Sequence, residues 1–243
     1  MKIINYVLIL LLVISLTSCK TENKEANKFK VDYNGALKHM MHKGDISAKV
    51  DLKAFAHKDH FYALGALENL KGEIQIFDSK PFNTMVIDST LRFDTTFDKK
   101  ATLLVYATVN KWKSFNIPEH IVTYKELENY IEQTAKKHLI TIDEPFPFLL
   151  EGTPKFIDWH VINWKDGDME HSHEKHVNSG LNGTLKKKQV EMLGFYSDSH
   201  HAIFTHHTTN MHIHVKTKDN KLAGHVDGLT LEKGMVLKLP YLK

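Results

Sequence analysis

The alternation of apolar and polar residues along the chain predicts a protein built mainly from β-strands. Residues 73–77 alternate between the two classes, which is typical of a strand with one buried face. Residues 101–109 are a second strong strand candidate, and residues 49–78 favour strands interrupted by turns. Strands are also expected at residues 156–164, 190–196, 211–217, 222–231 and 235–239.

One segment, residues 123–139, strongly predicts a helix. Thr123 and Glu126 have the spacing of a capping box, and core-facing positions follow at helical spacing. Residues 165–188 are polar and contain glycine, so we expect a long loop there. The pattern as a whole predicts a β-rich α+β fold with antiparallel hairpins and few helices.

The first residues of the chain predict export. Apart from Lys2, residues 1–18 carry no charge, and their apolar run has the length of a signal-peptide core. The run ends in Leu16-Thr17-Ser18-Cys19, which resembles the bacterial lipobox, whose cysteine becomes lipidated. We therefore expect a signal peptide at residues 1–18, a lipid on Cys19 and a flexible tether at residues 19–30.

The composition limits what the rest of the chain does. Residues 31–243 are long enough for one sizeable domain, or for two sub-domains that meet near residues 140–150. The formal net charge is only +3, so nucleic-acid binding is not expected. Cys19 is the only cysteine, which excludes disulfides within the chain and a thiolate zinc site. We expect the protein on the cell envelope, at the periplasmic face or outer surface, and in contact with the membrane only through its lipid.

Three of the many histidines fall in one predicted hairpin. Two β-prone runs flank the turn residues Asp219 and Asn220, and a two-residue turn centred there pairs His214 with His225. His212 shares a face with His214, because side chains two residues apart on a strand point the same way. Directly opposed residues also share a face. The three imidazoles are therefore predicted to converge on one side of the hairpin.

Three converging histidines without cysteine are typical of a catalytic zinc site, which keeps one coordination position open. We therefore predict that His212, His214 and His225 bind one zinc ion or another divalent metal. The same register places Asp227 opposite His212, where its carboxylate is expected to hydrogen-bond a ligand imidazole. The alternative is a set of three half-buried strand histidines that bind no metal.

Two further histidine groups leave several interpretations open. His171, His173 and His176 lie in the expected polar loop, where they fit a second metal site, an active-site lid or a solvated surface. His206 and His207 shortly precede the metal hairpin in the sequence. They are candidates to line its pocket, and so are His171 and His173.

The motifs around these residues resemble those of the α-acetolactate decarboxylases. Met-His-Ile-His-Val at residues 211–215, followed by Gly-His-Val-Asp at residues 224–227, is similar to the segment that supplies the family's three zinc-binding histidines. Residues 65–73 resemble the family segment that ends in its active-site glutamate, which is Glu73 here. Weaker similarities lie at residues 148–161 and 193–196.

The resemblance implies a zinc-dependent decarboxylase that converts 2-acetolactate to acetoin and carbon dioxide, or one that acts on a related 2-hydroxy-3-keto acid. In this chemistry the metal binds the ketone and hydroxyl oxygens and stabilises the enediolate that remains when carbon dioxide leaves. Glu73 is then expected to handle the proton. The resemblance also implies an acetolactate decarboxylase-like fold and a homodimer.

Three departures from the family pattern support a second hypothesis. The family has an active-site arginine in its central strands, whereas the only arginine here, Arg92, lies elsewhere. The family's threonine is Ala66 in this chain, and its C-terminal glutamate has no match before Lys243. An enzyme is favoured. The alternative is a non-catalytic exported lipoprotein that binds or carries the metal ion itself, and the export signal supports it because acetolactate is made by cytoplasmic metabolism.

Overall fold

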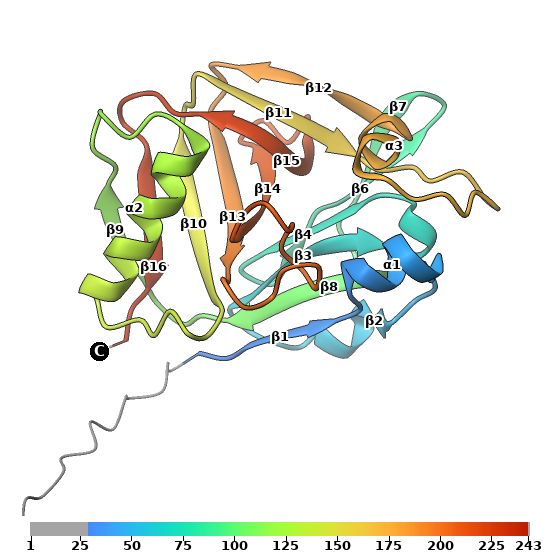
Figure 1. The fold of residues 1–243 in the computed structure, drawn as a ribbon, viewed down its shortest axis with the longest axis horizontal. Helices are drawn as coiled ribbons and strands as arrows, with labels where there is room; N and C mark the ends of the chain where they lie inside the picture. The colour runs from blue at the N-terminus through green and yellow to red at the C-terminus, as the bar shows by residue number, and fades with distance from the viewer. Residues whose placement is uncertain (1–28, 243) are drawn as a thin grey trace, which may run out of the picture.

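The computed structural model describes residues 29–242 of the chain. The expected signal peptide, the expected lipidation residue Cys19 and all but the last two residues of the expected tether lie outside the described residues. Within the described range, the strands form two eight-stranded antiparallel sheets, accompanied by three α-helices (Figure 1). The expected β-rich α+β class is therefore confirmed.

The first sheet is built from the N-terminal part of the chain, blue to green in Figure 1. Its central strands are almost wholly buried and apolar, because they have a neighbouring strand on each side and are covered on both faces. The predicted strand at residues 73–77 is present with the expected bounds. In sheet order the strands are β1 (Val31–Asn34), β8 (Lys100–Thr108), β3 (Phe61–Leu67), β4 (Glu73–Phe77), β6 (Asn83–Ile87) and β7 (Thr90–Asp94), with β2 (Val50–Asp51) on β8 and β5 (Lys80–Pro81) on β4.

The second sheet contains the predicted histidine hairpin at its centre. The strands predicted at residues 190–196 and 211–217 have the expected bounds, and the neighbouring predictions are correct to within a few residues. In sheet order the strands are β12 (Leu181–Lys186), β11 (Phe156–Val161), β15 (Ala223–Thr230), β14 (Met211–Thr217), β13 (Val190–Tyr196), β10 (Phe146–Gly152), β16 (Val236–Pro240) and β9 (Trp112–Asn116).

Helix α2 (Tyr124–Lys137) covers one face of the second sheet (Figure 1). The Thr123 hydroxyl accepts the Glu126 N–H at 3.3 Å, and the Glu126 carboxylate accepts the Thr123 N–H at 2.8 Å, so the predicted capping box is confirmed. Its buried residues Leu127 and Ile131 pack into the core of that sheet. The remaining helical segments are α1 (Leu37–Lys43), α3 (His173–Asn178) and two 3-10 turns, η1 (Leu52–Phe55) and η2 (Glu68–Leu70).

The prediction of a long loop at residues 165–188 is wrong, because this segment contains α3 and the edge strand β12. In β12 half-buried positions alternate with exposed polar ones, so no strongly apolar face marks the strand in the sequence. Its hydrogen bonds come from pairing with β11, which is a contact that the local sequence does not encode. Helix α3 is too short to show an apolar period and is recognised by its cap, where the Ser172 hydroxyl accepts the Lys175 N–H at 3.1 Å.

The two sheets pack against each other through a shared apolar core. Leu64 and Val105 of the first sheet belong to the same buried cluster as Leu193 and Phe195 of the second. Strand β4 also lies against β15 where the sheets meet, which brings Glu73 to the histidine hairpin. Among residues 29–242, no helix is long and apolar enough to cross a membrane.

Candidate metal centre

A row of three histidines crosses three neighbouring strands of the second sheet. His214 on β14 pairs with His225 on β15, as the hairpin register predicted, and His225 pairs on its other side with His160 on β11. Gly224 allows β15 to lie close to β11, because a Cβ atom there would be 2.5 Å from the carbonyl oxygen of His160. Directly opposed residues share a face, so all three imidazoles lie on the same side of the sheet.

His212 forms a compact cluster with His214 and His225, which we call the inner cluster. The ring centroids of His212 and His214 lie 5.0 Å apart, those of His212 and His225 5.1 Å, and those of His214 and His225 5.5 Å. The exposed fraction is 0% for His214 and 9% for His212. The three predicted ligands are therefore neighbours in space. His212 and His214 are buried, whereas His225 is half-buried, with 23% of its side chain exposed.

The inner cluster has the dimensions of a tetrahedral zinc site. Zinc–nitrogen bonds of about 2.1 Å at a tetrahedral angle place the centroids of two ligating imidazoles about 5.2 Å apart. The measured separations of 5.0, 5.1 and 5.5 Å lie on both sides of this value. In addition, Nδ1 of His212 and Nε2 of His214 are buried without a hydrogen-bond partner among the described residues. Because buried ring nitrogens normally have a partner, a bound cation fits this cluster.

Gln75 fixes the orientation of one ligand ring. Nδ1 of His214 lies 3.2 Å from the side-chain oxygen of Gln75, which can only accept, so Nδ1 donates and Nε2 carries the lone pair. The amide nitrogen of Gln75 donates to the Thr84 hydroxyl at 2.9 Å and to the Phe82 carbonyl, which turns its oxygen toward His214. Partners of this kind hold a metal ligand in its binding tautomer.

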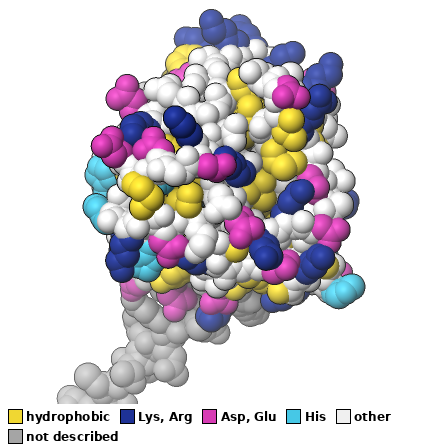
Figure 2. All heavy atoms as spheres, turned by 90° about the vertical axis from the view of Figure 1, so that its right-hand side faces the viewer, with side chains coloured by type: hydrophobic (Ala, Val, Ile, Leu, Met, Phe, Trp, Pro, Cys, Tyr) yellow, Lys and Arg dark blue, Asp and Glu magenta, His cyan; other side chains and the backbone are white. Residues whose placement is uncertain are grey.

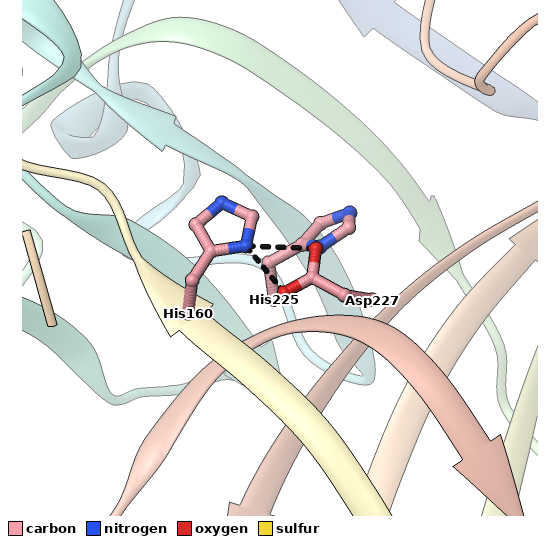
Figure 3. Close-up of side chains that lie close together, drawn as sticks. All are labelled: His160, His225 and Asp227. Carbon is pink, nitrogen blue, oxygen red and sulfur yellow. Dashed lines mark hydrogen bonds and ion pairs between the residues drawn. The ribbon is translucent and has the colours of Figure 1, made fainter. Parts of the chain in front are cut away.

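Asp227 plays the same part for His225 and also contacts His160 (Figure 3). Its carboxylate accepts from Nδ1 of His160 at 2.8 Å and from Nδ1 of His225 at 3.2 Å. The expected position of Asp227 opposite His212 needs correction. Regular pairing of β14 with β15 ends at His214 and His225, and Asp227 is the extra residue of a β-bulge against β11. The carboxylate therefore binds the rings of β15 and β11.

His160, His225 and Asp227 also form a candidate ligand group of their own, in which one ligand atom from each lies within 4.8 Å of the others (Figure 3). The two Nδ1 atoms of this group are hydrogen-bonded to the carboxylate, which leaves both Nε2 atoms free to bind other groups. The structure therefore offers two candidate ligand sets that share His225, this group and the inner cluster, and in the inner cluster Asp227 would orient His225. His160 adds a fourth imidazole to the site, with its centroid 4.8 Å from that of His225.

Glu73 reaches this site from β4 of the first sheet. Its Oε2 lies 3.7 Å from Nε2 of His214, and its Oε1 lies 3.8 Å from Nε2 of His160. Oε1 also accepts the backbone N–H of Ile162 at 3.1 Å. Burial raises the pKa of Glu73 to about 7, although the charge of His225 and the Ile162 hydrogen bond oppose the shift. Glu73 can therefore hold or release a proton near neutral pH.

Burial also sets the charge of the inner cluster. It holds the pKa values of His212 and His214 well below the ordinary range, because the cationic form of a buried imidazole loses its solvation. Burial likewise lowers the pKa of His225, but the hydrogen bond and charge of Asp227 outweigh this and raise it overall. Neutral imidazole is the form that binds a metal, so His212 and His214 are ready to act as ligands.

Comparisons with known proteins identify the fold. No protein-family model matches the sequence, and no curated protein matches it. Among solved structures, α-acetolactate decarboxylase from Bacillus subtilis strain 168 superposes with a TM-score of 0.69 over 87% of this chain and 85% of that chain, at 13% identity. The enzyme from Bacillus subtilis subspecies spizizenii gives 0.67 over 87% and 86%, at 14% identity. The chain has the α-acetolactate decarboxylase fold.

A third structure with the acetolactate decarboxylase fold comes from Staphylococcus aureus and is described as a protein of unknown function similar to α-acetolactate decarboxylase. It superposes with a TM-score of 0.64 over 86% of this chain and 84% of that chain, at 12% identity. The resemblance inferred from the short motifs therefore extends to the whole fold.

Residues 148–160 contain no arginine, which is one of the departures from the α-acetolactate decarboxylase pattern described above. In the structure this stretch contributes His160 to the site, whereas Arg92 is exposed on β7. Ala66, which replaces the family threonine, pairs with Glu73 across β3 and β4. The stretch without an arginine thus contributes an imidazole, which is hydrogen-bonded to Asp227.

The other candidate pocket histidines form two neighbouring groups. Nδ1 of His171 lies 2.9 Å from Nε2 of His176. The ring of His173 lies 4.8 Å from that of His206, which in turn lies 4.8 Å from that of His207. The first group belongs to the segment around α3, and the second joins α3 to the loop between β13 and β14.

Two residues of the site were not predicted from the sequence. His160 lies in a correctly predicted strand, but no local signal shows that this strand pairs with β15. Gln75 lies two residues after Glu73 on β4, so the two share a face. That spacing is the sequence signal that would have identified Gln75.

Proposed function

We propose that this protein is a zinc-dependent decarboxylase of 2-hydroxy-3-keto acids, with 2-acetolactate as the first substrate to test. The proposal is carried by one observation. A buried carboxyl group with its pKa raised to about 7 lies beside three converging histidines on an acetolactate decarboxylase fold. This pairs a candidate metal site with a group able to transfer a proton at neutral pH.

His212, His214 and His225 are the residues that would hold the ion. His212 and His214 each offer a buried ring nitrogen without a partner among the described residues, and Gln75 and Asp227 orient the rings of His214 and His225. A zinc ion held there supplies Lewis acidity, which stabilises the negative charge that develops on the substrate oxygens as carbon dioxide leaves.

Glu73 is the candidate proton donor. Loss of carbon dioxide breaks a carbon–carbon bond and leaves its electron pair on the substrate, and one proton must then form the new carbon–hydrogen bond. The Ile162 N–H binds Oε1 of Glu73, so the acid proton belongs on Oε2, the oxygen 3.7 Å from Nε2 of His214. The reaction consumes one proton in total, and Glu73 regains it from solvent.

His160 supports the acid form of Glu73. Asp227 accepts from its Nδ1, so Nε2 carries the lone pair and faces Oε1 of Glu73 at 3.8 Å. Burial lowers the pKa of His160, although the hydrogen bond to Asp227 opposes the shift. A neutral imidazole carries no positive charge that would stabilise the carboxylate form of Glu73.

The test is decarboxylation by zinc-loaded protein. Release of carbon dioxide from 2-acetolactate and from a panel of other 2-hydroxy-3-keto acids is measured for the wild type, for Glu73→Gln and for a control variant, Glu119→Gln, in which an exposed glutamate is changed. Glu73→Gln should slow the reaction by about 10²–10⁴-fold, while zinc content stays the same. Glu119→Gln should have no effect.

The same experiment distinguishes the enzyme from the carrier. Full zinc occupancy without metal-dependent release of carbon dioxide from any of these acids would refute the decarboxylase and favour an exported metal-binding lipoprotein. A loss of zinc in Glu73→Gln would instead identify Glu73 as a ligand. The second result would also refute the role assigned to Glu73 as proton donor.

We also propose that the protein acts at the cell envelope, attached by a lipid on Cys19. The support for this is the short apolar run and the lipobox-like tetrad that ends at Cys19. A substrate would then have to reach the protein outside the cytoplasm, so the panel of acids should extend beyond acetolactate itself.

A further inference from the structure

Three histidines from two separate segments form a row in which His206 contacts both His173 and His207, and we call them the outer cluster. His173 is the first residue of α3, whereas His206 and His207 lie in the loop between β13 and β14. The ring centroids of His173 and His206 are 4.8 Å apart, and those of His206 and His207 are also 4.8 Å apart. His173 and His207 are exposed and His206 is half-buried. Figure 2 shows histidine side chains at the surface on the left of the face in view and, separately, at its lower right.

The loop that carries two of these histidines is tied down at its base. Glu128 of α2 is buried and accepts from the Thr209 hydroxyl at 2.7 Å and from the Asn210 N–H at 2.9 Å. The carbonyl of Asn210 accepts the Ser197 N–H at 2.8 Å, which closes the two ends of the loop onto each other. The loop therefore presents His206 and His207 in a defined place.

The segment that carries His173 is fixed by independent contacts. Lys175 pairs with Asp168 at 3.2 Å, and its N–H donates to the capping hydroxyl of Ser172. The imidazole of His171 stacks on the Trp164 indole with centroids 4.3 Å apart. The approach of His173 to His206 thus results from two separately anchored segments.

The ring nitrogens of the outer cluster are not engaged elsewhere. Within residues 29–242, His173, His206 and His207 make no hydrogen bond through their side chains. His200 and His201 of the same loop, by contrast, are hydrogen-bonded to neighbouring side chains. Burial, together with the charges of His173 and His207, lowers the pKa of His206 to about 4, so its imidazole is neutral at neutral pH.

We propose that the outer cluster is a second metal site, which binds a divalent ion of the borderline class such as zinc, copper or nickel. Imidazole is a preferred ligand of these ions. Two imidazoles on one tetrahedral ion have centroids about 5.2 Å apart. The two measured separations of 4.8 Å are close to this value. Solvent supplies the remaining ligands of so exposed a site, so its affinity is lower than that of the inner cluster.

The outer cluster lies where it could deliver an ion to the inner cluster. His206 lies close enough to the inner site for its charge to act on His212, and the charge of His225 acts on His206 in turn. His212 and His214 are buried and only His225 of the inner cluster is partly exposed, so an ion reaches these ligands from the protein surface. The outer cluster captures the ion at that surface and raises its local concentration beside the buried ligands.

Zinc titration tests the second site. Metal-free protein, prepared without a polyhistidine tag, is titrated with zinc in competition with a chromophoric chelator. We expect about two zinc ions per chain, one tight and one weaker, because the outer cluster brings further imidazoles within 4.8 Å of one another outside the inner cluster. His173→Gln with His207→Gln, a pair of exposed substitutions, should remove the weaker ion and leave the tight one. It should also slow the filling of the tight site when zinc is scarce.

Two further variants separate this inference from the proposed function. His214→Ala with His225→Ala should remove the tight ion and keep the weaker one, which shows that the two sites are distinct. A control variant in which three exposed histidines are changed, at His42, His57 and His120, should retain both ions. Saturation of the wild type at one zinc per chain, or an unchanged weaker site in the His173 and His207 variant, would overturn the second site.

Discussion

Replacing Glu73 by glutamine should remove a pH dependence of stability from the metal-free protein. Glutamine has the shape of a protonated carboxyl group, and its side-chain oxygen can still accept the Ile162 N–H that Oε1 of Glu73 accepts at 3.1 Å. It cannot ionise. The comparison of wild type with Glu73→Gln therefore isolates the charge at this position and leaves the packing in place.

The magnitude follows from the shift in pKa. Burial raises the pKa of Glu73 from 4.5 to about 7. Between these values the unfolded chain loses its proton while the folded protein keeps it. A raised carboxyl pKa therefore stabilises the folded state at the acid end of this window, and the stabilisation is lost as the pH rises through 7. Linkage gives a difference of about 2–3 kcal/mol in unfolding free energy between about pH 5 and pH 8.

The assay is urea unfolding of chelator-treated protein at both pH values. Other groups titrate in the same range, among them His212 and His214, whose lowered pKa values reduce stability as the pH falls. These groups are present in both proteins. The unfolding free energy of the wild type minus that of Glu73→Gln is therefore compared between the two pH values, and its change is due to Glu73. A change below about 0.5 kcal/mol, which is within the error of the extrapolation, would show that the folded protein does not hold Glu73 protonated. The proposed proton donor would then be refuted.

Three other variants test separate parts of the structure. His214→Ala with His225→Ala should abolish tight zinc binding in elemental analysis, and an unchanged metal content would exclude the inner cluster as the site. Asp227→Asn should weaken zinc binding by about 10–100-fold in a chelator competition, because His225 loses the carboxylate that orients it; equal affinity would mean that this contact does not support the metal. Cys19→Ala should leave the protein without lipid and move it to the soluble fraction, and a variant that still carries lipid would contradict the assignment of the anchor.

The register of the histidine hairpin could be predicted because everything that determines it is local. Asp219 and Asn220 mark the turn, and the period of two along each strand then determines which residues share a face. The pairing of His214 with His225 follows from those two facts and is observed. The capping box at Thr123 was predictable for the same reason, since both of its members lie within one turn of helix.

The rest of the site depends on contacts between distant segments. His160 reaches the hairpin because β11 pairs with β15, and Glu73 reaches it because the first sheet packs on the second. Many pairings bury similar apolar surface, so the sequence alone does not select these two. The role expected for Glu73 came from a family motif and not from its spacing to the histidines.

The residues proposed for metal binding and the residue proposed for proton transfer lie on different sheets. The candidate metal ligands and Asp227 lie on adjacent strands of the second sheet, whereas Glu73 and Gln75 reach over from β4 of the first. A substitution at Glu73 can therefore change proton transfer without moving the strands that hold the histidines. Metal binding is likewise independent of Glu73, because a chain that kept the inner cluster and lost this one carboxyl group would still have the ligands for a metal. On this scaffold the buried acid at Glu73, more than the histidines, is the feature that distinguishes a decarboxylase from a metal carrier.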